Sequence, residues 1–216
     1  LSRFPDLWFT VAVFSNYLLF FIMGFWAVNI ISGEYRQRTF RQAIIMGLSR
    51  SNYFFMKLLH LVSAALVFTF IYALVSLVLA LQFESNISSA FSSGGIYLLK
   101  HFLLAMIYGL GAAIFALWIR KSGLSFIAFL GYFILERLIV WFLGSYVSSI
   151  FADFHFWPRK ICNQLAPDFI MRFGEQLGQS GLTGSVLPDI QVLIAGLTLL
   201  VLLMCVLYLS IMRKDI

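Results

Sequence analysis

Glu136 and Arg137 are adjacent ionisable residues inside a long apolar stretch, Leu124–Ser149. Charged side chains at membrane depth are costly, so such a pair is by default a candidate functional site. Adjacent residues on a helix point about 100° apart, so the two need not pair with each other. Each is able to bond to a neighbouring helix, bond to a partner chain or reach a water-filled vestibule. A structural or gating role is favoured over direct substrate contact.

Motifs for other chemistry are absent from the sequence. There is no G-x-x-x-x-G-K-[ST], so the chain has no phosphate-binding loop for ATP. It also lacks H-E-x-x-H and G-x-S-x-G, and His60, His101 and His155 lie on different segments. We therefore expect no catalytic residue, metal site or cofactor in this chain, and an intramembrane enzyme is the least favoured class.

The composition is that of an integral membrane protein. Of the 216 residues, 62% are hydrophobic and 11% are charged, and the mean hydropathy is +0.95. Soluble domains are about 45–50% apolar and about 25% charged. The net charge of +6 is interpreted as a topology signal and not as a surface for nucleic acid. Cys162 and Cys205 lie far apart and indicate neither a metal site nor a disulfide framework.

Five stretches are apolar enough to cross a bilayer, which takes roughly 20 residues. They are Leu7–Ile31, Leu58–Phe83, Ile96–Ile119, Leu124–Ser149 and Ile190–Met212. They predict an all-α membrane protein, with residues 1–216 forming a single transmembrane domain. Lys100 and His101 lie near the start of the third stretch, where they are expected to extend toward the membrane surface.

The basic residues predict the orientation of these spans. Nine of the 15 Lys and Arg residues lie in three segments, Gly33–Lys57, Arg120-Lys121 and Arg213-Lys214. Alternation of spans places all three on one side, and the positive-inside rule makes that side cytoplasmic, together with the C-terminus. Leu1 is then outside although no signal-peptide pattern precedes it. We therefore expect six spans in the full chain, the first lying upstream of residue 1.

The basic segment Gly33–Lys57 carries its own structural signals. Phe40, Ala43, Ile44 and Gly47 fall on one side of a predicted helix, with Arg36, Arg38, Arg41 and Gln42 on the remainder. Gly47 is a predicted stop, and Ser49 or Ser51 is a predicted cap for the next helix. Charge alone could hold this segment at the membrane surface as an interfacial anchor. The alternative is a docking element for a cytoplasmic partner.

The segment resembles the cytoplasmic loop of ABC-2-type transporter permeases, the membrane subunits of ATP-driven exporters. In that family a Glu closes one span, a Thr or Ser with basic residues follows, and a "G-L-S-R"-like turn precedes a Lys at the head of the next span. The corresponding residues here are Glu34, Arg38-Thr39, "GLSR" at 47–50 and Lys57. The resemblance covers the whole chain in topology and about 25 residues in motif.

The resemblance implies that this segment is a coupling helix seated in a groove of a separate ATPase, which would hold ATP and Mg²⁺. Phe40 and Ile44 would be its anchors. Arg36, Arg38 and Arg41 would pair with acids on the ATPase rim or with lipid phosphate, and Glu34 and Thr39 belong to the same coupling motif.

The resemblance also implies a location and an assembly. Two permease chains, identical or related, would meet in the bacterial cytoplasmic membrane, and the external segment Ile150–Asp189 would form short helices that dip back and cap the pathway. The main alternative is a membrane accessory or immunity protein that binds a partner and transports nothing.

Overall fold

The computed structural model describes residues 4–37, 39–83, 87–146, 157–166 and 188–213, and every regular element in them is an α-helix. The helices are α1 (Phe4–Arg36), α2 (Thr39–Ile45), α3 (Arg50–Phe83), α4 (Ile87–Ile119), α5 (Ser122–Tyr146), α7 (Pro158–Leu165) and α9 (Asp189–Met212). The predicted all-α class is confirmed.

Five of these helices, α1, α3, α4, α5 and α9, are long and apolar enough to cross a membrane. They coincide with the five predicted spans, so the chain is a multi-pass integral membrane protein. α1 and α3 contain 33 and 34 residues. At about 1.5 Å per residue each is roughly 50 Å long, which exceeds a hydrocarbon core of about 30 Å. Their ends therefore extend beyond the bilayer core.

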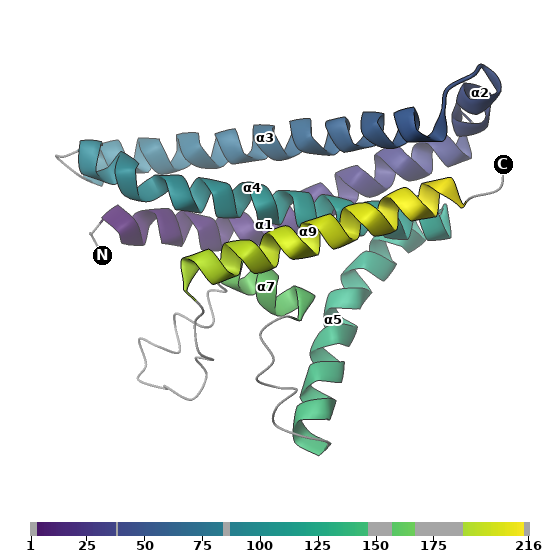
Figure 1. Cartoon of the computed structure of the whole chain (residues 1–216). Helices are drawn as coiled ribbons and strands as arrows, with labels where there is room; N and C mark the ends of the chain where they lie inside the picture. The colour runs from purple at the N-terminus through teal and green to yellow at the C-terminus, as the bar shows by residue number, and fades with distance from the viewer. Residues whose placement is uncertain (1–3, 38, 84–86, 147–156, 167–187, 214–216) are drawn as a thin grey trace.

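α4 is the central helix of the bundle. It packs against α1, α3, α5 and α9. Its buried face is rich in small residues, including Ala105, Ala112, Ala113 and Ala116. Small residues let helix backbones approach closely where the hydrophobic effect between helices is weak. Figure 1 shows α1, α3, α4 and α9 side by side, with α5 diverging from them and α7 lying against α9.

The three predicted basic segments meet at the end of the bundle that carries α2. Arg50, at the start of α3, donates from Nη1 to the Met212 carbonyl at 2.5 Å. The Arg120 guanidinium, in the turn between α4 and α5, lies 5.5 Å from the centre of the Tyr35 ring. The predicted grouping on one side is therefore confirmed, and this side is called the α2 end below.

Candidate functional site

α2 ends in a well-defined backbone stop. The Leu48 N–H donates to the Ala43 carbonyl and the Gly47 N–H donates to the Ile44 carbonyl, both at 3.0 Å. These two bonds make a Schellman motif, which needs a left-handed residue after the helix. Gly47 supplies it with a φ of +97°. The predicted stop at Gly47 is confirmed.

The helix that follows α2 begins with a side-chain cap. α3 starts at Arg50, and the Asn52 N–H donates to the Ser49 Oγ at 3.2 Å. A hydroxyl in this position satisfies one of the N–H groups that a helix start leaves without a partner. Of the two predicted caps, Ser49 is the one that the structure uses.

Phe40 corrects one detail of the predicted coupling helix. Its ring lies 4.7 Å from Tyr53 and 5.3 Å from Tyr35, centre to centre, and the side chain is 4% exposed. Ile44 is half-buried against the same core. The apolar face of α2 therefore packs onto α1 and α3 and presents no free ring to a partner. Packing against Tyr35 and Tyr53 removes the Phe40 ring from water within the chain itself.

Two residues that the sequence argument did not select are exposed instead. Ile45 and Met46, at the C-terminal end of α2, are 79% and 82% exposed. The sequence did contain a sign of this exposed tip. The apolar residues just before Gly47 run on consecutively, so they cannot all lie on the helix face that contains Phe40. Among the predicted cations, Arg36 is exposed, whereas Arg38 and the Arg41 side chain lie outside the described residues.

Beneath α2, a buried polar cluster joins the end of α1 to the start of α3. Glu34 accepts a hydrogen bond from the Tyr53 hydroxyl at 2.7 Å through Oε2, and it forms an ion pair with the Lys57 ammonium through Oε1. The Lys57 side chain is 4% exposed and that of Glu34 is 27% exposed. The Thr39 hydroxyl donates to the Glu34 carbonyl at 3.3 Å, which ties the start of α2 to the same cluster.

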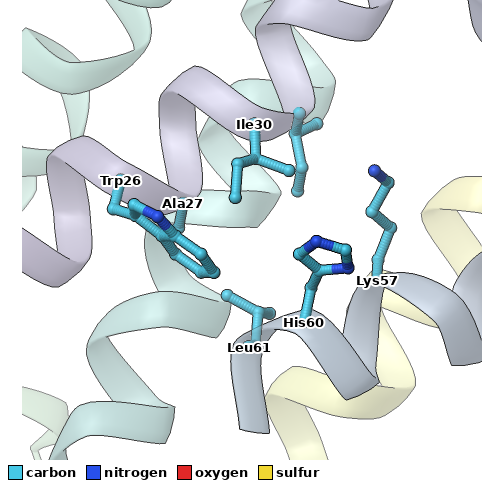
Figure 2. Close-up of a pocket in the computed structure, with 7 residues that line it drawn as sticks. Trp26, Ala27, Ile30, Lys57, His60 and Leu61 are labelled. Carbon is cyan, nitrogen blue, oxygen red and sulfur yellow. The ribbon is translucent and has the colours of Figure 1, made fainter. Parts of the chain in front are cut away.

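A small pocket lies next to this cluster, between α1 and α3 (Figure 2). Trp26 and Ile30 of α1 face Lys57, His60 and Leu61 of α3. The Trp26 and His60 rings are 6.3 Å apart, centre to centre. In the part of the chain that the structure describes, no three His, Cys, Asp or Glu residues are close enough to hold a metal ion. The other residues that line this pocket include no Cys, Asp or Glu.

Glu136 and Arg137 point into different surroundings. Glu136 is 4% exposed, and its Oε1 accepts a hydrogen bond from the Arg159 backbone N–H of α7 at 2.8 Å. This N–H belongs to the first turn of α7, which begins with Pro158. A carboxylate there satisfies a helix-end donor and lies at the favourable end of the helix dipole. Arg137 is exposed, so the expectation that the neighbours need not pair is confirmed.

The other end of α7 is held by α1. The Asn16 Nδ2 donates to the Ala166 carbonyl at 2.9 Å, and the Asn16 Oδ1 accepts from the Tyr108 hydroxyl at 2.9 Å. Along α7, Cys162 is fully buried, and burial raises the pKa of its thiol. The Leu165 side chain packs against Gly196 of α9, where an added Cβ would lie 3.3 Å from Leu165 Cδ1. Sequence reasoning missed Asn16, which carries no motif.

Lys100 and His101 are a second correction. His101 is 2% exposed, with its Nε2 2.6 Å from the Ser15 hydroxyl and its ring stacked on Tyr72 at 4.5 Å. The Lys100 ammonium donates to Asp189 at 2.5 Å. Neither side chain extends freely to the membrane surface, because each finds a polar partner on a neighbouring helix.

Comparison with known protein families, with curated proteins and with solved structures finds no match to this chain.

Proposed function

We propose that this protein is the permease subunit of an ABC exporter of the ABC-2 type, powered by a separate ATPase that binds ATP and Mg²⁺. The observation that carries the proposal is the construction of the α2 end. A seven-residue helix with a defined stop at Gly47 lies between α1 and α3, and the Ser49 cap opens the second of these spans.

The mounting of α2 suits the transmission of force. Phe40 packs on Tyr35 of α1 and Tyr53 of α3, and the Glu34–Lys57 ion pair joins the same two helices below. A push on α2 would therefore move α1 and α3 together, because packed cores transmit strain and do not deform continuously.

The contact with the ATPase is assigned to the exposed tip. Ile45 and Met46 would enter an apolar groove of the partner, and the exposed Arg36, with Arg38 and Arg41, would face acids around it. This assignment places the α2 end and the C-terminus in the cytoplasm, in the cytoplasmic membrane of a bacterium. Two permease chains would form the pathway, and α7 would cap it from the opposite side.

Isolation of the protein from its native membranes tests the proposal. A P-loop ATPase should co-purify in stoichiometric amount, and the complex should hydrolyse ATP. Cysteines placed at Ser49 and Lys121 should react with an impermeant reagent only from the cytoplasmic side. A stable complex with a protein that does not bind ATP would instead favour the accessory or immunity role.

A further inference from the structure

Arg50 is the first residue of α3, a place that its own helix does not favour for a cation. The N-terminal end of a helix carries partial positive charge, so acidic side chains are stabilised there and basic ones are not. The first turn of α3 contains no acidic residue that would offset the charge of Arg50. The stabilisation of this half-buried residue therefore has to come from outside α3.

The partner of Arg50 is the end of α9. Its Nη1 donates to the carbonyl of Met212, the last residue of α9, at 2.5 Å. The last four carbonyls of a helix accept no bond within it, and they carry the negative end of the helix dipole. A basic side chain at this end satisfies a carbonyl and interacts favourably with the dipole. The contact therefore stabilises the end of the last span, although Arg50 itself begins α3.

A second contact lies one turn further along the same two helices. The Phe54 and Tyr208 rings meet edge to face with their centres 5.2 Å apart. In each helix the two contact residues are four positions apart, so they share one helix face. The two contacts therefore follow a pair of antiparallel helices, and together they fix the end of α9 against the start of α3.

α9 extends from this contact to α7 (Figure 1). Near its end, the Trp118 indole N–H of α4 donates to the Ser210 hydroxyl at 3.3 Å, so Arg50 is not the sole attachment there. Further along, Gly196 packs closely on Leu165 of α7, as described above. Close-packed interiors compress little and transmit strain. α9 therefore connects the α2 end of the bundle to α7.

We infer that Arg50 makes α9 the third spanning helix to follow α2, beside α1 and α3, and that α9 carries this movement to α7. The stop at Gly47 and the cap at Ser49 place Arg50 directly after the turn that ends α2. A displacement of this turn reaches α9 through one guanidinium and one ring pair. The inference rests on the proposed function for the source of the movement, a partner ATPase, whereas the contact between α3 and α9 does not. Arg50 is accordingly a positioning residue, separate from the exposed tip of α2.

Hydrogen exchange of the purified full-length chain, without an ATPase, tests the contact. Arg50→Gln should speed amide exchange in the last turn of α9, residues 209–213, about fivefold, as for the net loss of one hydrogen bond. The start of α3 should exchange no faster, because the substitution removes a cation from its N-terminal end. Arg50→Lys should recover part of the protection, since it keeps the charge at the end of α9. Lys121→Gln, which removes an exposed cation from the turn between α4 and α5, is the control and should change neither region.

Two outcomes of this measurement would overturn the inference. One is unchanged exchange at the end of α9 in Arg50→Gln. The other is equally faster exchange at the start of α3, because Arg50 would then stabilise its own helix and not α9.

A second measurement, on the complex with its ATPase, tests the movement. An ATP analogue that is not hydrolysed should alter exchange in α7 of the parent chain. In Arg50→Gln the ATPase should remain bound, because Ile45 and Met46 are unchanged, and the response of α7 should be lost. No response in the parent chain, or a full response in Arg50→Gln, would overturn the inference, and loss of the ATPase would assign Arg50 to the docking surface instead. A parent chain that retains no ATPase would refute the proposed function and with it the source of the movement, whereas exchange at the end of α9 would still decide the contact.

Discussion

The two short helices that the structure describes, α2 and α7, are each associated with a glutamate, half-buried Glu34 and buried Glu136, but they are attached in different ways. Glu34 does not bind α2 through its carboxylate. It pairs with Lys57 and Tyr53 of α3, while α2 rests on the same helices through the ring of Phe40. Glu136 binds the main chain of α7 directly, and Asn16 binds the opposite end.

The difference teaches which parts move together. α2 is covalently continuous with the ends of two long spans and packed on both, so it follows their motion. α7 is bound near its start by Glu136 of α5 and at its end by Asn16 of α1, and its buried side packs on α9 and α4. Loss of one of these polar side chains can therefore loosen an end of α7 while the long helices stay packed. Substitutions that break one of these attachments should therefore change the stability or the local opening of one short helix.

Removing the Glu34 carboxylate should have the largest effect. Glu34→Ala leaves the buried Lys57 ammonium without its anion, at a cost of about 4 kcal/mol in the free energy of unfolding. The double variant Glu34→Leu/Lys57→Met removes both charges and should recover most of that loss. Unfolding in mixed micelles measures both. Equal stability of the single and double variants would show that the ion pair is not the attachment.

Truncating Phe40 should loosen α2 without melting the spans. Phe40→Ala removes a buried ring at the edge of the molecule, and the site can partly collapse, so we expect a loss of about 3 kcal/mol. The loss should appear as faster amide hydrogen exchange in residues 39–48, with α4 unchanged. Uniformly faster exchange over the whole chain would contradict a local role. Gln42→Ala, on the exposed side of α2, is the control.

The Glu136 prediction concerns α7. Glu136→Leu leaves the Arg159 N–H without its partner in a buried place, which costs about 2 kcal/mol. Glu136→Gln keeps an acceptor oxygen and should cost less than half of that. Protease sensitivity near α7 is the readout, and transport by the proposed exporter complex is the second one. Equal results for the two variants would show that the hydrogen bond from the Arg159 N–H is not what Glu136 contributes to the attachment of α7.

The smallest effect is expected at the stop after α2. Gly47→Ala places a Cβ on a residue with a φ of +97°, which costs about 1–2 kcal/mol for an ordinary residue. A Cβ there meets no neighbouring atom within 4 Å, so the cost is backbone strain alone. Gly33→Ala, at an equally open position inside α1, is the matched control and should be neutral or stabilising.

The features that sequence could predict are local ones. The five spans follow from apolar length, and the stop at Gly47 and the cap at Ser49 follow from residue type over a few positions. The direction of Phe40 could not be predicted, because an amphipathic helix does not say which neighbour covers its apolar face. Asn16 and Ala166 are 150 positions apart, so their contact has no signature in the sequence. Glu34 and Lys57 could both be selected from the sequence, but the ion pair between them could not be predicted.

The central claim is that the exposed tip of α2 docks a partner ATPase, and one measurement tests it most directly. Met46→Asp puts a carboxylate on the 82% exposed tip, and Gln42→Asp puts the same charge on the exposed side of the same helix. Both variants should insert and fold like the parent chain. The account predicts that Met46→Asp lowers the amount of co-purified ATPase at least tenfold, whereas Gln42→Asp changes it less than threefold. Full ATPase retention by Met46→Asp would contradict the claim.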